Sequence, residues 1–164
     1  MTTSVLLDTN VVLDLLLARA PFDTDAVAVA SMAARGEIVA YIGATSVTTI
    51  HYIARKSLGA RDADAAIARL IQLFQVAPVT EQVIRNAAER GFDDFEDAVL
   101  DAAAELVGVD ALITRDSAGF KRSKIPVFAP HELVFALAAR AGNASPPDLW
   151  PHPEVDVDVE EEDT

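Results

Sequence analysis

The first strand of this sequence can be recognised from its apolar pattern alone. Val5-Leu6-Leu7 leads directly into Asp8, and a second apolar run begins at Val11. A strand that is buried on both faces of a parallel sheet is apolar throughout and becomes polar only where it emerges. Because ligands of open α/β sheets bind beyond the carboxyl ends of the strands, Asp8 is expected at a ligand site. Alternatively, Asp8 is only a turn or capping residue, and Asn10 is suited to cap the helix that follows.

Short apolar runs alternate with helical stretches along most of the chain. We expect strands at residues 5–7, 38–42, 75–77, 111–114 and 127–128. We expect helices at residues 10–18, 23–35, 47–58, 63–74, 81–90, 94–107 and 130–141, with Ser46 and Thr80 capping two of them. This alternation predicts an α/β fold in which a parallel β-sheet is sandwiched between α-helices.

The sequence divides into one expected domain, residues 1–141, and an acidic tail, residues 142–164. The tail contains eight Asp or Glu, four Pro and no Lys or Arg, a composition typical of disordered segments. Trp150 is the tail residue best suited to pack back onto the domain. The net charge of −13 is concentrated there, since the rest of the chain has 18 acids against 13 bases, a net charge of −5.

The composition restricts the kinds of metal site that are possible. The chain has no Cys, which excludes disulfides and thiolate sites and is typical of a cytoplasmic protein. Its three His residues are scattered, so a metal would be a hard cation held by oxygen ligands. No apolar run approaches the ~20 residues that a membrane span requires.

The second concentration of acid is Asp93-Asp94-Phe95-Glu96-Asp97. On a helix, four acids fall within about 80° of arc and form a stripe, while Glu96 points away from it. The stripe consists of Asp94, Asp97, Asp101 and Glu105. It contains no Lys or Arg, so its carboxylates are expected to repel one another without an internal partner. The alternative is a solvated face whose first-turn acids suit the helix dipole.

Two further observations favour a shared site for these acids. Asp8 and Asp116 each follow an apolar strand, and both should therefore emerge at the same edge of the sheet. Hydrolysis of phosphodiesters with Mg²⁺ or Mn²⁺ needs such a group of carboxylates, which hold one or two hard cations that activate water.

Three motifs in order resemble the PIN-domain family: Asp8-Thr9-Asn10 after the first strand, Asp94-Phe95-Glu96-Asp97-Ala98 opening a helix, and Thr114-Arg115-Asp116 after a later strand. The resemblance covers roughly residues 4–135. It implies a parallel sheet between helices and a metal-dependent endoribonuclease that uses Mg²⁺ or Mn²⁺ on an RNA substrate. Many bacterial members are toxins of the VapC type, each neutralised by a small antitoxin protein. The resemblance leaves open an antitoxin and a homodimer as partners.

By position, the resemblance implies that Asp8, Asp97 and Asp116 are catalytic metal ligands and that Asp94 is an auxiliary ligand. Two positions depart from the family pattern. Thr49 stands where the family usually has Glu, and Gly119 stands where an acid is common in this branch. A hydroxyl can hold a metal-bound water but is a poorer cation ligand than a carboxylate.

The remaining candidates are residues that could orient the carboxylates and bases that could contact RNA. Asn10, Thr49 and Thr114 are interpreted as auxiliary or orienting residues, and His51 as a packing or surface residue. Four bases close to Asp116 are interpreted either as contacts to RNA phosphates or as a solvated loop. These bases are Arg115, Lys121, Arg122 and Lys124.

Two other functions remain as alternatives. A phosphotransferase with Asp8 as nucleophile is disfavoured, because such enzymes usually carry a second Asp two positions on, where this chain has Asn10. A catalytically weak or inactive PIN-like module that binds RNA or protein is favoured by Thr49.

Overall fold

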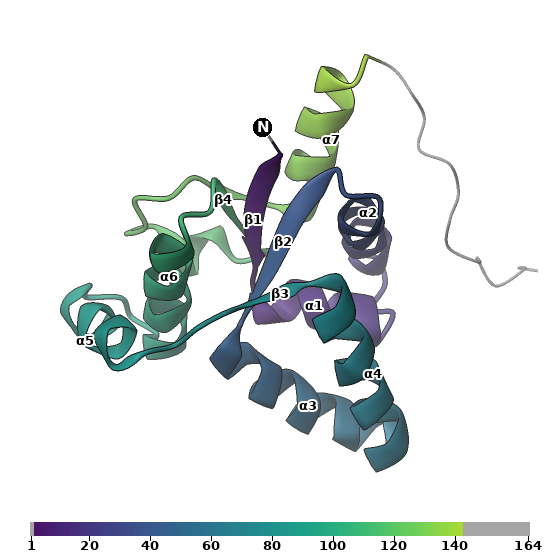
Figure 1. Cartoon of the computed structure of the whole chain (residues 1–164), viewed down its shortest axis with the longest axis horizontal. Helices are drawn as coiled ribbons and strands as arrows, with labels where there is room; N and C mark the ends of the chain where they lie inside the picture. Colours follow the sequence, from purple (N-terminus) through teal and green to yellow (C-terminus); the bar gives the residue numbers. More distant parts are fainter. Residues whose placement is uncertain (1, 143–164) are drawn as a thin grey trace, which may run out of the picture.

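The computed structural model describes residues 2–142 (Figure 1). Five parallel strands form one sheet in the order β3-β2-β1-β4-β5. The strands are β1 Thr3–Leu7, β2 Ile38–Gly43, β3 Gln75–Ala77, β4 Ala111–Ile113 and β5 Val127–Phe128. The chain therefore moves outward from β1 to β3 and then returns to the other side of β1. This reversal leaves the carboxyl ends of β1 and β4 side by side, at the place where open α/β sheets bind ligands.

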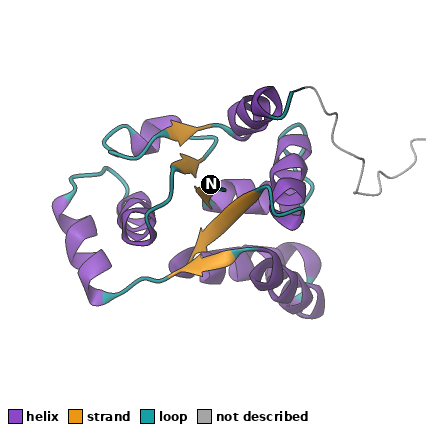
Figure 2. Ribbon diagram, turned by 45° about the horizontal axis from the view of Figure 1, so that its top comes forward, coloured by secondary structure: helices purple, strands orange, loops and turns teal. Residues whose placement is uncertain are grey.

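Helices cover both faces of the sheet, as Figures 1 and 2 show. One face is covered by α1, α2, α3, α4 and α7, and the other by α5 and α6, which pack against each other. The helices are α1 Thr9–Leu16, α2 Asp23–Ala34, α3 Ala44–Leu58, α4 Ala60–Leu73, α5 Glu81–Glu89, α6 Phe95–Val107 and α7 Pro130–Arg140, with a 3-10 turn, η1, at Ser117–Phe120. The predicted parallel sheet between helices is confirmed.

The central strands divide their side chains between two apolar cores. Val5 and Leu7 of β1 face the core beneath α1–α4 and α7, whereas Leu6 faces the core beneath α5 and α6. Leu6 pairs in register with Tyr41 of β2 and Leu112 of β4, which face the same side. Both faces of the sheet are thus buried, which is why Val5-Leu6-Leu7 is apolar without alternation.

Most predicted elements lie within a few residues of the observed ones, but α3 begins earlier than expected. It starts at Ala44 rather than at residue 47, so Ser46 is not its cap but a fully buried residue inside its first turn. Gly43 precedes the helix, and a Cβ there would lie 2.5 Å from Leu100 Cδ2. The missing side chain lets α6 approach the β2–α3 junction closely. Thr80 caps α5 as predicted, since its hydroxyl accepts from Val83 N at 3.3 Å.

The predictions of disorder and of a Trp150 anchor concern residues 143–164 and lie outside the described residues. Among residues 2–142, no helix is long and apolar enough to cross a lipid bilayer.

Candidate active site

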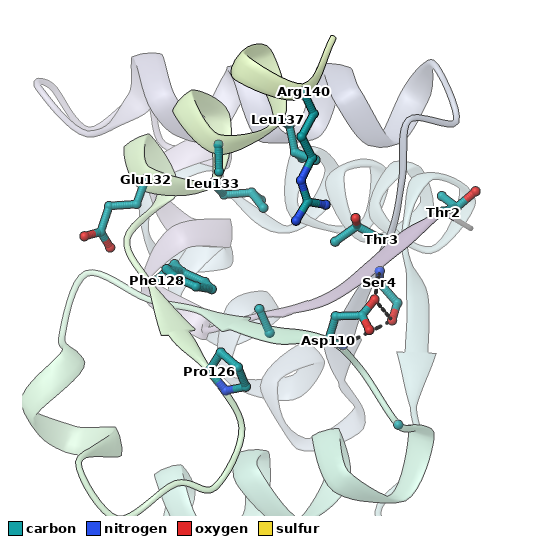
Figure 3. Close-up of a pocket in the computed structure, with 13 residues that line it drawn as sticks. Thr2, Thr3, Ser4, Asp110, Pro126, Phe128, Glu132, Leu133, Leu137 and Arg140 are labelled. Atoms are coloured by element: carbon teal, nitrogen blue, oxygen red, sulfur yellow. Dashed lines mark hydrogen bonds between the residues drawn. The ribbon is translucent and has the colours of Figure 1, made fainter.

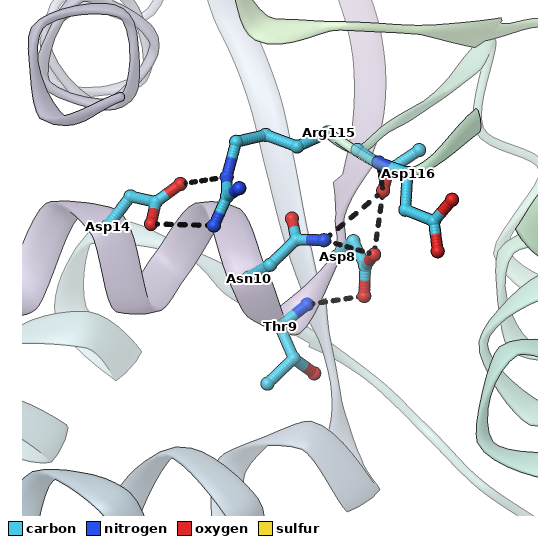
Figure 4. Close-up of polar contacts among 7 residues, drawn as sticks. Asp8, Thr9, Asn10, Asp14, Arg115 and Asp116 are labelled. Atoms are coloured by element: carbon cyan, nitrogen blue, oxygen red, sulfur yellow. Dashed lines mark hydrogen bonds and ion pairs between the residues drawn. The ribbon is translucent and has the colours of Figure 1, made fainter. Parts of the chain in front are cut away.

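Asp8 is held rigidly at the carboxyl end of β1 (Figure 4). Its Oδ1 accepts a hydrogen bond from Thr9 N at 2.7 Å, and its Oδ2 accepts from Thr114 Oγ1 at 2.7 Å and from Asn10 Nδ2 at 3.0 Å. The side chain is almost fully buried. Burial raises the pKa of Asp8, and the hydrogen bonds from Thr114 and Thr9 oppose that rise. Asn10 and Thr114 therefore hold the Asp8 carboxylate in place, and the cap of α1 is Asp8 rather than Asn10, which lies inside the helix.

Asp97 of α6 and Asp116 of the β4–η1 turn approach the same point in space. A Cβ built on Gly119 would lie 2.6 Å from Asp97 Oδ2 and 3.4 Å from Asp116 Oδ2. The missing side chain of Gly119 is therefore what allows the two carboxylates to face each other. Asp116 is fixed from its backbone, because its N–H donates to Thr114 Oγ1 at 2.9 Å. The Thr114 hydroxyl thus joins Asp8 to Asp116.

The carboxylates act on one another electrostatically. Partial burial, followed by the charges of Asp8, Asp94, Asp116 and Glu96, raises the pKa of Asp97 to about 6. Among residues 2–142, no Lys or Arg forms an ion pair with Asp8, Asp97 or Asp116. The structure therefore brings together the three acids that the motifs singled out, without an ion pair to any of them among residues 2–142. Asp94 caps α6 through Glu96 N at 2.7 Å and remains close enough to influence Asp97.

Glu96 lies outside the acid stripe, as predicted, but its side chain still reaches the site. Glu96 Oε1 lies 3.5 Å from Thr9 Oγ1, and the Thr9 hydroxyl also lies 3.0 Å from the buried Ser46 Oγ of α3. Burial and the charges of Asp94 and Asp8 raise the pKa of Glu96. Helical periodicity placed Glu96 off the acid stripe, but α6 begins beside the end of β1, so a first-turn side chain outside the stripe still reaches the site.

The acid stripe is also divided, which the sequence did not indicate. Asp101 is buried and pairs with Arg90, which follows α5, and with the Ser123 hydroxyl. Glu105 pairs with the same Arg90. The stripe has no internal cationic partner, as expected, but Arg90 from outside it pairs with Asp101 and Glu105, so the expected repulsion without a partner is wrong for these two acids. Asp94 and Asp97 alone belong to the site.

Thr49 is half-buried on α3, and no hydrogen bond joins it to the acids in the described part of the chain. The contact from α3 to this region is made by Ser46, one turn earlier. His51 Nε2 lies 2.7 Å from Asp64 Oδ1 of α4.

The four bases near Asp116 are in different environments. Arg115 pairs with the buried Asp14 of α1, whereas Lys121 lies 3.6 Å from Asp93 Oδ2. Arg122 and Lys124 are exposed. Sequence reasoning missed three residues here: Asp14, Ser46 and Glu96. The signal for Asp14 was available, since it is the one charged residue in the apolar run 11–17.

The sequence matches the PIN domain family over residues 4–118, more than half of the chain. This chain belongs to the PIN domain family. The resemblance indicated by the three motifs is thereby confirmed, and the match includes the acids of the site. No curated protein matches the sequence.

Solved structures of toxin–antitoxin proteins share the fold of this PIN domain. A chain of VapBC2 from Rickettsia felis, bound to a DNA fragment from its promoter, has a TM-score of 0.61 at 12% identity, covering 77% of this chain and 98% of its own. VapC20 from Mycobacterium tuberculosis, a sarcin–ricin loop cleaving toxin, has a TM-score of 0.53 at 20% identity, covering 66% and 86%. A toxin–antitoxin complex from Klebsiella pneumoniae has a TM-score of 0.57 at 22% identity, covering 77% and 97%. At these identities the likeness shows the fold.

The chemistry of the donor set of this PIN domain fits a hard divalent cation. Carboxylate oxygens are the ligands that Mg²⁺ and Mn²⁺ prefer, and here several of them meet without a basic partner. As placed, no three acid or histidine side chains of residues 2–142 lie close enough to enclose an ion. The acids therefore share a space without forming a closed set of ligands.

A separate pocket of about 580 Å³ opens at the opposite end of the sheet, where β1 and β4 begin (Figure 3). Ser4 and Asp110, near the amino ends of β1 and β4, line one side of it, and Leu133 and Leu137 of α7 line the other. Its polar side is internally satisfied, because Asp110 Oδ2 accepts from Ser4 N at 2.8 Å. The acids of the site lie at the carboxyl ends of the strands and do not line this pocket.

Proposed function

We propose that this PIN domain is a metal-dependent endoribonuclease that hydrolyses RNA phosphodiester bonds. The observation that carries the proposal is the approach of Asp97 and Asp116 to one point beside Gly119, next to a buried Asp8 and without a neutralising base. Like charges held together in this way are stabilised most directly by a bound cation. No side chain of this group is arranged as a nucleophile with an adjacent base, so the attacking group would be water.

The residues of the site would have three kinds of role: they would hold the cation, orient its ligands or attract RNA. Asp8, Asp97 and Asp116 would hold Mg²⁺ or Mn²⁺, with Asp94 as an auxiliary ligand. When bound, such a cation supplies an activated water and neutralises charge on the phosphorus-bound oxygens. Asn10 and Thr114 hold the Asp8 carboxylate in one orientation through its Oδ2. Lys121, Arg122 and Lys124 would attract the RNA backbone from the neighbouring loop.

We further propose that the chain is the toxin of a toxin–antitoxin pair. Support comes from its fold, which it shares with proteins described as toxin–antitoxin complexes and with a sarcin–ricin loop cleaving toxin. A small antitoxin protein and a second copy of the chain are the partners to be tested, by co-expression with the neighbouring reading frame and by measuring the mass of the purified protein in solution.

The function is tested by RNA cleavage with and without Mn²⁺. We expect cleavage by the parent chain with Mn²⁺, its loss with a chelator, and its loss in Asp97→Asn, which should remain folded. Glu105→Gln is the matched control, because Glu105 lies on the same helix face but pairs with Arg90 outside the site. Undiminished cleavage by Asp97→Asn would reject the mechanism.

A second candidate is a binding module without catalysis, which is favoured by Thr49 and by the absence of a closed set of ligands among residues 2–142. Measuring the Tm during a Mn²⁺ titration distinguishes the nuclease from the binding module. A nuclease should gain stability as the acids bind the ion, whereas a binding module should show no Mn²⁺-dependent change.

A further inference from the structure

Asp14 is a buried charge on an otherwise apolar helix. It is the one charged residue of α1 and is 1% exposed. A buried carboxylate is costly unless it is paired and hydrogen-bonded. Its partner, Arg115, lies 101 residues away in the sequence, directly before Asp116. Arg115 Nε donates to Asp14 Oδ2 at 2.5 Å and Nη2 donates to Asp14 Oδ1 at 3.1 Å, so the ion pair is bidentate (Figure 4).

A second contact holds the same guanidinium. Arg115 Cζ lies 4.0 Å from the centre of the Phe22 ring, a cation–π geometry. Phe22 precedes α2 and is 44% exposed, so little other packing accounts for its position. Arg115 is therefore fixed in two directions, by a carboxylate in the plane of the guanidinium and by an aromatic ring against its face.

One end of the guanidinium remains available. Within residues 2–142, both hydrogen bonds of Arg115 use Nε and Nη2, and Nη1 makes no hydrogen bond. The side chain is 29% exposed. Its charge also acts on the site, since burial raises the pKa of Asp8 and Arg115 is among the effects that oppose that rise.

We propose that Asp14 and Phe22 are positioning residues that hold Arg115 as a preformed clamp for an RNA phosphate beside the carboxylates. This inference rests on the proposed ribonuclease function. A guanidinium presents fixed, directional donors to phosphate, and holding it in place beforehand removes the entropy cost of ordering it when RNA binds. Lys121 has only the exposed Asp93 beside it, and Arg122 and Lys124 are exposed, so these three bases would supply attraction without orientation.

Asp14→Asn should lower kcat, a result that electrostatic attraction alone does not predict. Asp14→Asn removes a negative charge near bound RNA, so general attraction alone would strengthen binding and leave kcat unchanged. A loosened Arg115 would instead misplace the phosphate, so we expect kcat to fall roughly tenfold or more while KM stays equal or decreases. Phe22→Leu tests the second contact at a partly exposed position, where folding is less affected, and should lower kcat in the same way by a smaller factor.

The experiment measures kcat and KM for Mn²⁺-dependent cleavage of a labelled single-stranded RNA of mixed sequence, together with the Tm of each variant. The matched control is Glu37→Gln, which removes the carboxylate of another Arg pair, Arg35 Nε to Glu37 Oε1 at 2.5 Å, at the amino-terminal edge of the sheet. Asp14→Asn and Phe22→Leu with the same kcat as Glu37→Gln would overturn the positioning role while the proposed function stands. A parent chain that cleaves no RNA with Mn²⁺ would overturn the proposed function and this inference together.

Discussion

Asp97 stands out among the single residues because its surroundings favour its protonated form. Burial and four neighbouring carboxylates raise its pKa to about 6, whereas an unfolded Asp titrates near 4. Between these two values the folded chain binds more protons than the unfolded chain. The stability of the metal-free protein should therefore fall as pH rises from about 4 to 6, and the loss should persist above 6.

Asp97→Asn should consequently raise the Tm of the metal-free protein at pH 7 by a few degrees. The gain should shrink as the pH falls below 6 and disappear below about pH 3, where Asp97 is protonated in both states. Thermal unfolding in the presence of a chelator, across this pH range, measures it. Asp62→Asn, at an exposed acid in the first turn of α4, is the control and should show no such pH dependence. A Tm difference that stays constant with pH would contradict the prediction.

Substitution of Gly119 should weaken metal binding without changing the stability of the fold. Its φ lies outside the left-handed region, so Ala is compatible with the backbone, but the new Cβ would meet Asp97 Oδ2 at 2.6 Å. The end of the Asp97 side chain can rotate away at little cost. We expect Gly119→Ala to leave the Tm nearly unchanged and to weaken Mn²⁺ binding roughly tenfold, measured by calorimetry.

The neighbouring Ser117→Ala, in the same 3-10 turn and at an exposed position, should bind Mn²⁺ as the parent does. Equal Mn²⁺ affinity in Gly119→Ala and the parent would show that the approach of Asp97 to Asp116 is not needed for the metal.

At the level of elements, a polar network connects α6 with the end of α5 and with the loop after η1. Asp101 contacts Arg90 and the Ser123 hydroxyl, and that hydroxyl accepts from Ile125 N at 3.1 Å. This network fixes the loop that carries Lys121, Arg122 and Lys124. Asp101 lies one helical turn from Asp97, so α6 contributes to the site on one turn and to its support on the next.

Asp101→Ala should therefore lower the free energy of unfolding by about 3 kcal/mol, because it leaves Arg90 largely buried without its buried partner. Urea denaturation measures the change. Glu105→Gln removes the exposed partner of the same Arg90 and should cost less than about 1 kcal/mol. Losses of similar size in the two variants would indicate that burial of Asp101 does not decide the energy of this network.

For the whole molecule, the distribution of charge should affect the proposed binding of RNA. Residues 142–164 contribute eight acids and no base, so their removal changes the net charge from −13 to −5. We expect deletion of residues 143–164 to tighten RNA binding by Asp97→Asn, which should not cleave its ligand, and the effect should fade as salt is raised.

Fluorescence anisotropy with a labelled RNA at low and high salt measures this effect. A variant that retains the tail but has its eight acids changed to Asn or Gln is the control and should match the deletion. Weaker RNA binding by the truncated chain would show instead that the tail contributes contacts to the complex.

Three features could be predicted from the sequence: the order of the elements, the parallel sheet and the end of the sheet at which Asp8 and Asp116 emerge. Those features follow from local apolar runs and from turn and capping residues, whose effects act over a few positions. Which acids lie at the site, and which pair with a base elsewhere, depends on contacts between elements that are far apart in the sequence. Glu96 reaches the site, Asp101 and Glu105 are neutralised by Arg90, and Arg115 is held by Asp14, 101 residues away. Helical periodicity describes only one helix, whereas the charge state of a carboxylate depends on groups that other elements bring within a few ångströms of it.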